Sequence, residues 1–314
     1  MKFRVIGDMH VDINAGRVPE FGDDVFTVVC GDTSGQPGES VKWIRKNFRR
    51  GICVSGNHLP YNDQGKTIGA LRRDLVSAFG PDGDFTYLDA LTGTVSKVVD
   101  GVLFVGSCLY SDMKIRSGVN PEGDLGLNML ISGSRMNDFR FGLTEDFLGE
   151  IRKIRPDDYV EWNRATLAEF DRVLGENEHS GNPLPAVVVT HYPMSRRFAE
   201  NSLYVDRDNF PSYANDMEEW FSGHPSVRCH CCGHCHDIPE KDRSFVLKRA
   251  EMPDVLMVNN SFGYFRDFHD LDFRPNLFVD TKTWTVSDAG DSSDYSKDKE
   301  RRRGDLKKML SFFT

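Results

Sequence analysis

The sequence predicts one α/β domain, and three features of its first sixty residues carry that prediction. Three short apolar runs rich in β-branched residues, at 3–6, 25–30 and 51–55, have the length of buried strands. Between the second and third runs, residues 39–48 place apolar side chains at helical spacing, which completes a βαβ unit. Each run ends in a polar cluster, and open α/β sheets place their functional sites at the carboxyl ends of strands.

Length and composition agree with a single globular unit. The chain has 314 residues, of which 39% are hydrophobic and 28% are charged, so a packed core is expected rather than disorder. The net charge of −9 argues against a general electrostatic attraction to nucleic acid or to an anionic membrane. It is compatible with phosphate substrates, because bound divalent cations would reverse the local field.

The compartment is inferred from the start of the chain and from its cysteines. The chain opens on a predicted strand rather than on a charged leader, and no apolar stretch approaches the roughly 20 residues that span a bilayer. Seven cysteines, an odd number, do not indicate a secreted disulfide framework. We therefore expect a cytoplasmic protein in a reducing environment, with no role at a membrane.

The rest of the chain adds further strands and two insertions. A hairpin is expected around Asp100-Gly101, and additional elements are a short helix at 217–221 and strands at 95–99, 102–105, 185–190, 227–232, 255–258, 276–279 and 283–286. Residues from about 111 to 138 show no sustained period and contain several glycines, so they are expected to form a lid-like loop. Residues from about 144 to 175 carry apolar stripes that predict a helical insertion.

These patterns divide the chain into two parts. Residues 1–290 are expected to form the domain, and residues 291–314 a charged C-terminal tail or helix whose last apolar residues share one helical face. The basic run at 301–303 is interleaved with acids and is interpreted as part of a solvated tail.

The polar clusters after the strands are rich in side chains that bind metals. Asp8 and His10 are two residues apart, so on an extended segment they point the same way. Five further candidates follow later strands: Asp32, Asn57, His191, His234 and His236. Imidazole combined with carboxylate suits zinc, manganese, iron or nickel better than calcium or magnesium. Seven ligands exceed what one tetrahedral ion needs, and they are enough for two ions about 3.5–4 Å apart that share a bridging carboxylate.

The order of these clusters resembles that of a known family. The set Gly-Asp-x-His, Gly-Asp, Gly-Asn-His, strand-Thr-His and Gly-His-x-His, from Asp8 to His236, is similar to the motifs of the calcineurin-like metallophosphoesterases. The resemblance implies a four-layer α/β/β/α sandwich of two mixed sheets, with a dinuclear metal site at the strand ends.

The resemblance also implies a role for each candidate residue. One metal would be held by Asp8, His10 and His236, the other by Asn57, His191 and His234, and Asp32 would bridge the two opposite a water or hydroxide. His58 would contact the substrate beside Asn57 and donate a proton to the leaving oxygen, so it is the catalytic candidate among the side chains.

Two positions depart from the family pattern. Gly35 stands where a later acid of the second motif usually orients the catalytic histidine, and Leu59 stands where the third motif usually ends in Asp or Glu. Neither missing residue is a metal ligand, so metal binding is still expected. What supports His58 is left open, and Asp63 is one candidate for that role.

Several features have a second interpretation. The cysteines between Cys229 and Cys235 have a spacing that suits a structural zinc or an iron–sulfur site, but no second Cys-x-x-Cys pair exists, and buried strand cysteines are common. Arg196, just past His191, is a candidate for binding a substrate phosphate or one half of a solvated surface pair with Arg197. The same two interpretations apply to four basic residues in or beside the lid-like segment: Lys114, Arg116, Arg135 and Arg140.

Together these patterns predict an enzyme that hydrolyses a phosphomonoester or phosphodiester with a metal-activated hydroxide and two divalent ions of manganese, iron, zinc or nickel. One alternative is a catalytically impaired protein of the same fold that binds metal and a phosphate ligand, motivated by the departures around His58. Another is a Cys/His zinc module without phosphate chemistry. A small molecule or nucleotide is favoured as the substrate, because basic and aromatic residues do not cluster.

Overall fold

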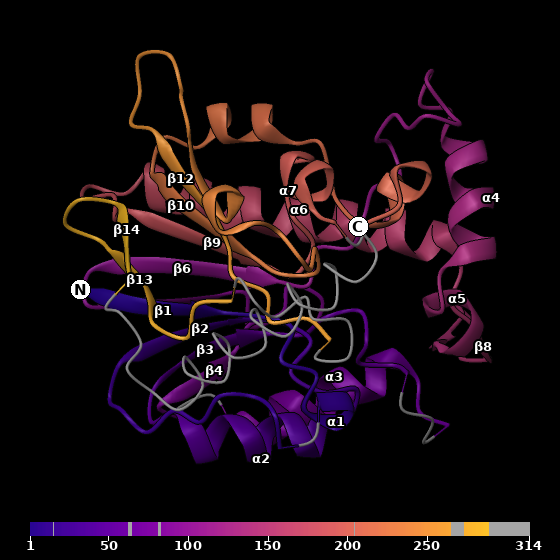
Figure 1. Cartoon of the computed structure of the whole chain (residues 1–314), viewed down its shortest axis with the longest axis horizontal. Coiled ribbons are helices and arrows are strands. Elements are labelled where there is room, and N and C mark those ends of the chain that lie inside the picture. The colour runs from indigo at the N-terminus through magenta and orange to yellow at the C-terminus, as the bar shows by residue number, and fades with distance from the viewer. Residues whose placement is uncertain (15, 62–64, 81–82, 204, 265–272, 289–314) are drawn as a thin grey trace, which may run out of the picture.

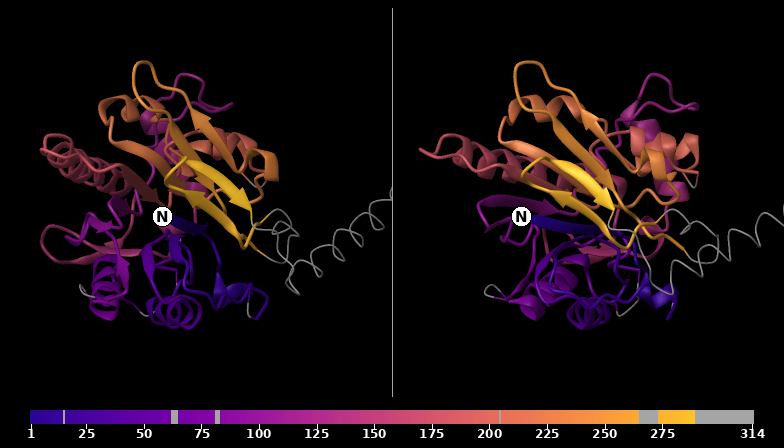
Figure 2. Two further views of the ribbon diagram at one scale, coloured as in Figure 1. Left: turned by 90° about the vertical axis from the view of Figure 1, so that its left-hand side faces the viewer. Right: turned by 60° about the vertical axis from the view of Figure 1, so that its left-hand side comes forward.

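The computed structural model describes residues 1–14, 16–61, 65–80, 83–203, 205–264 and 273–288. These residues form two mixed sheets that pack face to face, with helices on both outer faces (Figure 1, Figure 2). The four-layer α/β/β/α sandwich that the motifs imply is therefore confirmed.

The first sheet is built on the N-terminal βαβ unit. Over the described residues it has six strands in the order β14–β13–β1–β2–β3–β4. Strands β1 to β4 run parallel, and β13 and β14 add antiparallel pairs at one edge. The bounds are β1 Lys2–Ile6, β2 Phe26–Cys30, β3 Gly51–Val54, β4 Phe85–Tyr87, β13 Leu277–Asp280 and β14 Thr285–Asp288. The pattern of the sequence predicts every one of these strands except the three-residue β4.

The second sheet also has a parallel centre and antiparallel edges. Within the described ranges its six strands follow the order β11–β12–β10–β9–β6–β5. The bounds are β5 Ser96–Val99, β6 Val102–Ser107, β9 Ala186–Thr190, β10 Val227–Cys232, β11 Ser244–Leu247 and β12 Val255–Asn259. The expected hairpin joins β5 to β6, and both turn residues are left-handed, Asp100 at φ 48° and Gly101 at φ 76°. That conformation matches the tight turn that Asp-Gly favours.

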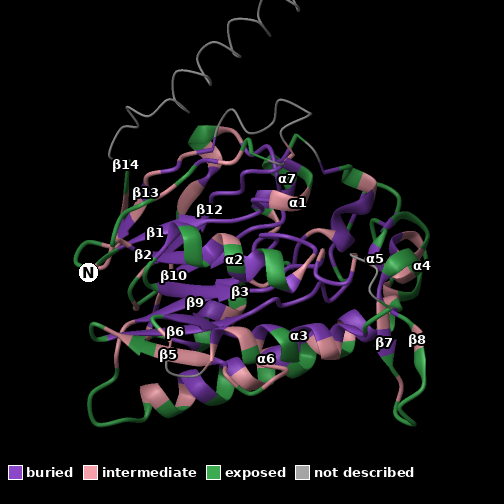
Figure 3. Cartoon of the chain, turned by 90° about the horizontal axis from the view of Figure 1, so that it is seen from below, coloured by how far each residue is buried: buried purple, intermediate pink, exposed green. Residues whose placement is uncertain are grey.

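Three apolar layers hold the sandwich together. Side chains such as Val28, Phe104 and Val189 fill the space between the sheets. Helices α2 and α3 cover the first sheet, whose strands behind them are buried (Figure 3). Helix α6 packs on the outer face of the second sheet. The helices are α1 Val11–Asn14, α2 Pro37–Asn47, α3 Ile68–Phe79, α4 Leu125–Arg135, α5 Asp138–Phe141, α6 Pro156–Glu178 and α7 Arg197–Asn201, with 3-10 turns η1 Arg207–Ser212, η2 Glu218–Gly223 and η3 Glu240–Asp242.

The prediction that 111–138 forms a lid-like loop is wrong for the 11 residues of α4. The first turn of this helix is capped by the Asp124 side chain accepting from the Leu127 N–H at 2.7 Å. The helix escaped detection because its buried face is polar. Asn128 and Ser132 are the buried residues of α4, and both are fully enclosed, whereas Leu130 is 71% exposed.

The helical insertion expected at about 144–175 is correct only in its second half. Strands β7 (Leu143–Glu145) and β8 (Ile151–Lys153) form a separate antiparallel hairpin, and α6 begins at Pro156. Proline is favoured in the first turn of a helix, where its missing N–H has no intrahelical acceptor. The apolar residue Phe147, which suggested a helix face, lies in the turn of the hairpin and is 93% exposed. The short helix expected at 217–221 is the 3-10 turn η2.

The C-terminal tail predicted for 291–314 lies outside the described residues. None of the helices in the described ranges combines the length and the apolar character that crossing a bilayer requires.

Helix α4 is fixed to the body through Asn128. The side-chain amide donates to the carbonyl oxygens of Met113 at 2.8 Å and Ile115 at 3.1 Å, and its oxygen accepts from the Asn120 amide at 2.8 Å. We predict that Asn128→Ala lowers the free energy of unfolding by about 2–4 kcal/mol, because it leaves buried polar groups unpaired. The matched change Leu130→Ala, on the exposed face of the same helix, should stay within about 0.5 kcal/mol. Urea denaturation measures both, and equal stabilities would show that α4 is not anchored in this way.

Candidate metal centre

The candidate ligands converge because five strands end at the same edge of the sandwich. The motifs follow β1, β2 and β3 in the first sheet and β9 and β10 in the second. Backbone hydrogen bonds join these ends directly. The Asp8 N–H donates to Gly31 O at 3.1 Å, the His10 N–H to Asp32 O at 3.0 Å, and the Gly233 N–H to His191 O at 2.9 Å.

The backbone at the candidate ligands is strained. Four of them have a left-handed conformation that residues other than glycine rarely adopt: φ is 56° at Asp8, 42° at His10, 45° at Asp32 and 66° at His234. Such strain costs free energy and persists only where the surrounding structure imposes it, commonly at functional sites. The strained turns direct these side chains toward one another.

Two motif glycines are required by the close approach of a carboxylate. A Cβ atom at Gly56 would lie 2.0 Å from Oδ1 of Asp32, and a Cβ atom at Gly233 would lie 2.6 Å from Oδ2 of Asp8. No real Cβ atom tolerates such contacts. The glycines before Asn57 and before His234 therefore make room for the two acids of the site.

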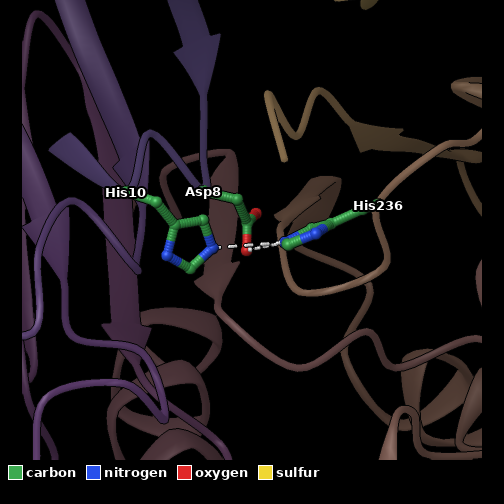
Figure 4. A group of neighbouring side chains, drawn as sticks. All are labelled: Asp8, His10 and His236. Carbon is green, nitrogen blue, oxygen red and sulfur yellow. Dashed lines mark hydrogen bonds and ion pairs between the residues drawn. The ribbon is translucent and has the colours of Figure 1, made fainter. Parts of the chain in front are cut away.

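The first group consists of Asp8, His10 and His236, all buried (Figure 4). Nε2 of His236 lies 3.1 Å from Oδ1 of Asp8 and 3.4 Å from Nε2 of His10. The Asp8 carboxylate also accepts from the Ser261 hydroxyl at 2.7 Å and from the His234 N–H at 2.9 Å. These bonds fix the orientation of the acid.

Asp32 lies between the two groups. Its Oδ2 is 3.4 Å from Nε2 of His191 and 3.9 Å from Nε2 of both His10 and His58. Its Oδ1 accepts from the His58 N–H at 3.0 Å. One carboxylate oxygen of Asp32 therefore lies among three imidazole rings.

The second group contains Asp32, His191 and His234, with Asn57 beside them. Nδ1 of His191 donates to the Cys30 carbonyl oxygen at 2.9 Å, which leaves Nε2 directed at Oδ1 of Asn57, also 2.9 Å away. In the neutral ring that Nε2 carries a lone pair, and so does the amide oxygen. The contact therefore requires a proton or a metal cation between the two atoms.

The pKa values of the site residues follow from burial and from the charges of their neighbours. Burial acts to raise the pKa of Asp8, but the hydrogen bond and charge of His236 outweigh it and hold the pKa below its ordinary value. Burial is likewise outweighed at Asp32, mainly by the charge of His191, and the pKa of Asp32 lies well below its usual range. At His191 burial acts to lower the pKa, but Asp32 raises it to about 9. Burial lowers the pKa of His10 and of His234 well below the usual histidine range.

These pKa values favour metal binding by most of the candidate ligands. The carboxylates are ionised, and His10 and His234 are neutral, which are the forms that bind cations. His191 must release its proton when a cation binds, so the cation and the proton compete for this position.

The residues present suit the binding of divalent metal ions. Three groups of His and Asp, each with ligand atoms within 4.8 Å of one another, occur among the described residues and share His10 and Asp32. Nε2 of His234 is buried and has no hydrogen-bond partner in the described structure. A buried nitrogen without a partner is costly unless an ion or water binds it. Imidazole, carboxylate and amide oxygen are together the donor set of manganese, iron or zinc.

A pocket of about 200 Å³ opens onto this cluster. Its floor is formed by Asp32, Asn57, His58, His234 and His236, whereas Asp8, His10 and His191 lie behind the floor and are fully buried. Its walls are Tyr61, Tyr213 and Tyr264 together with Arg135, Met136 and Asn137 at the end of α4. Each tyrosine covers a histidine: Tyr61 covers His58, Tyr213 covers His234 and Tyr264 covers His10, with ring centroids 4.2, 5.0 and 4.6 Å apart.

Two tyrosines support the His58 ring where the family pattern has the later acid that Gly35 replaces here. The Tyr264 hydroxyl lies 3.1 Å from Nε2 of His58, and the Tyr61 ring packs on the imidazole. The Tyr61 hydroxyl donates to the buried carboxylate of Asp138. The Gly35 position carries no side chain that can reach His58, and Asp63, the suggested substitute, lies outside the described residues.

One set of site residues was missed although the sequence contains a signal for it. Asn259 is the last residue of β12, and Asn260 and Ser261 follow it, so the three form a further polar cluster at a strand end. Ser261 donates to Asp8, and the Asn259 amide donates to Gly233 O at 2.8 Å. Tyr264 lies three residues beyond Ser261. Tyr61 lies three residues beyond His58. Both tyrosines are therefore close in sequence to a residue of the site, whereas no neighbouring motif marks Tyr213 or Arg135.

Arg196 does not lie at the pocket. Its guanidinium contacts Glu200 at 2.8 Å and Asp216 at 3.6 Å, and it lines a separate surface groove with Arg116 and Arg207. Of the basic residues for which two interpretations were open, Arg135 is the one that lines the pocket.

The cysteines form no candidate metal cluster. All seven are free and buried, and none takes part in the possible metal-binding groups of the described residues. Cys229 and Cys231, with sulfurs 3.6 Å apart, belong to the layer between the sheets. Burial raises the pKa of the Cys229 thiol, so it stays protonated and weakly reactive.

Comparison with known proteins supports the fold. The structure resembles that of a phosphopantetheinyl hydrolase from Mycobacterium tuberculosis, with a TM-score of 0.59 and 19% identity over 85% of this chain and 91% of that chain. A dimetal phosphatase from Danio rerio aligns with a TM-score of 0.42 and 14% identity over 82% of this chain and 86% of that chain. No protein-family profile and no curated protein matches the sequence. The chain therefore shares its fold with the phosphopantetheinyl hydrolase, and this fold is the four-layer sandwich that the motifs imply.

The contact at Gly56 gives a direct test of the candidate centre. We predict that Gly56→Ala displaces the Asp32 carboxylate and weakens Mn²⁺ binding by roughly 10- to 100-fold. Gly38→Ala in α2, where an added Cβ meets nothing within 4 Å, is the matched control and should bind Mn²⁺ as the unaltered protein does. Isothermal titration calorimetry measures both. Wild-type affinity in Gly56→Ala would mean that Asp32 does not bind the metal.

Proposed function

We propose that the protein is a dinuclear metal-dependent phosphoesterase that hydrolyses a phosphomonoester or a phosphodiester. The observation that carries this proposal is the buried Asp32 carboxylate, set among three imidazoles at the floor of a pocket. A structural role alone does not explain so many polar groups gathered without full hydrogen bonding in the interior.

In this proposal Asp8, His10 and His236 would hold one ion, Asn57, His191 and His234 would hold the other, and Asp32 would be shared by both. When bound, two divalent cations lower the pKa of a water toward neutrality and offset the negative charge that develops on the phosphoryl oxygens. Manganese, iron, zinc and nickel all suit this donor set.

His58 supplies the proton that the leaving oxygen needs. Its side chain is 14% exposed and lines the pocket, so it can reach a bound substrate. The Tyr264 hydroxyl holds the Nε2 atom, and the Tyr61 ring restricts rotation of the imidazole. These contacts favour a catalytic role over the alternative of an impaired binding protein, because the support that the missing acid would give is replaced.

The size of the pocket supports a small substrate. A volume of about 200 Å³ accommodates a phosphate and a compact leaving group. We accordingly propose a small molecule or nucleotide over a protein or a nucleic acid. The similar structure is described as a phosphopantetheinyl hydrolase, which is also consistent with a small phosphate ester.

We place the catalytic domain at residues 1–290. The unpaired cysteines support a reducing, cytoplasmic environment.

Substitution of the candidate ligands tests the proposal. We predict that Asp32→Ala and His191→Ala each lower the turnover of 4-nitrophenyl phosphate or bis(4-nitrophenyl) phosphate, with added Mn²⁺, by at least about 1,000-fold. His179→Ala, at the exposed end of α6, is the matched control and should keep wild-type turnover. Unchanged turnover in both ligand variants would refute the proposal. Full metal occupancy without hydrolysis of any ester by the unaltered protein would favour the impaired binding protein instead.

Removing the Tyr264 hydroxyl tests whether this residue orients His58. We predict that Tyr264→Phe lowers kcat by about 10-fold while Mn²⁺ affinity stays within about 2-fold, because the hydroxyl orients His58 without contacting a metal in this assignment. In the variant, an ester with a highly acidic leaving group should lose less activity than one with a poorly acidic group. Equal losses with both leaving groups would show that the tyrosine does not act through the proton donor.

A further inference from the structure

Arg135 is the cationic residue of the pocket. Among the residues that line the pocket within the described ranges, no other lysine or arginine is present. It is the last residue of α4, and its Nη1 lies 3.0 Å from Oδ2 of Asp206. An arginine beside a phosphate-sized cavity presents planar donors that match phosphate and carboxylate oxygens.

The position of Arg135 is fixed by the body of the protein. Helix α4 is held by the buried Asn128 contacts described above and by Ser132, whose hydroxyl lies 2.6 Å from that of Ser212 in η1. Both serines are fully buried or nearly so. The arginine therefore stands on a docked helix rather than on a flexible lid, so binding an anion there costs little backbone ordering.

The ion pair with Asp206 does not prevent Arg135 from binding a ligand anion. The two side chains are 42% and 64% exposed. Pairs between such exposed side chains contribute little to stability and are screened by salt. A ligand anion inside the pocket can replace Asp206 as the partner of Arg135 without a large loss of stability.

The depth of each residue separates two binding positions in the pocket. Asp32, His234 and His236 at the floor are only 4–5% exposed, whereas Arg135 is 42% exposed and so lies at the mouth. In the proposed function the scissile phosphate binds at the floor. The group that reaches Arg135 is then part of the leaving portion, which extends outward.

We propose that Arg135 selects substrates whose leaving portion carries a second anionic group, a phosphate or a carboxylate, close to the scissile phosphate. This inference rests on the proposed function and names the substrate class of the same site. The walls fit this class, since Tyr213 and Met136 offer apolar contact to the short linker between the two charges.

Two matched substrates test the selection. Phenyl phosphate and 4-carboxyphenyl phosphate differ only in the anion on the leaving group. The unaltered protein with Mn²⁺ should show a KM at least about 10-fold lower for the carboxylated ester. Arg135→Ala should raise that KM by roughly 10- to 100-fold and leave the KM of phenyl phosphate within about 2-fold. Arg135→Lys should fall between, because lysine keeps the charge but loses the planar pair of donors.

Two controls separate this role from general effects. Arg196→Ala removes a comparable surface arginine that lies outside the pocket, so both KM values should remain unchanged. Urea denaturation should give Arg135→Ala the stability of the unaltered protein. A rise in KM of the same size for both substrates would place Arg135 at the scissile phosphate and overturn the inference. So would an absence of preference for the carboxylated ester in the unaltered protein.

A binding measurement keeps this inference distinct from the proposed function. Phenylphosphonate and 4-phosphonobenzoate are not hydrolysed, and calorimetry with the Mn²⁺-loaded protein compares their affinities. Tighter binding of 4-phosphonobenzoate that disappears in Arg135→Ala supports the inference even if no ester is turned over, in which case only the proposed function fails. Equal affinity of both phosphonates for the unaltered protein overturns the inference even if esters are hydrolysed.

Discussion

Asp32 places a carboxylate in the protein interior, with one oxygen within 3.4–3.9 Å of three imidazole nitrogens. Removing a carboxylate from water is costly, and this one is retained because the histidines around it offset its charge. The surrounding structure is arranged to keep that contact. Gly56 leaves the space that the Asp32 carboxylate fills, the His58 N–H binds its second oxygen, and the backbone of Asp32 itself is left-handed. A cation shared by these groups would convert a strained, charge-balanced interior into a stable one.

Both sheets supply candidate ligands to the site around Asp32. Strands β1 to β3 deliver Asp8, Asp32 and Asn57, and β9 and β10 deliver His191 and His234. Neither sheet alone supplies a complete set for either proposed ion, so the packing between the sheets sets the distance between ligands. The inter-sheet layer, with Val28, Phe104 and Val189, therefore determines the geometry of the centre as well as the stability of the fold. A volume change in that layer would be transmitted to the centre, because close-packed interiors deform little.

The sequence predicts the elements whose signal is local. Apolar runs predict most strands, and the polar residues that follow them predict the seven candidate ligands, which the structure brings to one edge. Helix α4 was missed because its buried face is polar, at Asn128 and Ser132, and periodicity detects only apolar faces. The β7–β8 hairpin was missed because its exposed apolar residues imitate a helical stripe. The pocket walls were beyond prediction for a different reason. Tyr61, Tyr213 and Tyr264 come from separate loops and Arg135 from the end of α4, and only tertiary packing makes them neighbours.

The electrostatics of the pocket reconcile an acidic protein with an anionic substrate. The net charge of −9 is spread over the whole chain, and exposed charges more than about 8 Å away are largely screened at physiological ionic strength. Among the candidate ligands only Asp8 and Asp32 carry negative charge, so two divalent cations would leave an excess of positive charge that a phosphate dianion can balance. That charge acts through a buried, low-dielectric environment and is little screened. The field of bound cations would weaken toward the mouth, where solvent enters. Arg135 lies there, and its charge would attract the proposed second anion at a depth where the cations would no longer do so.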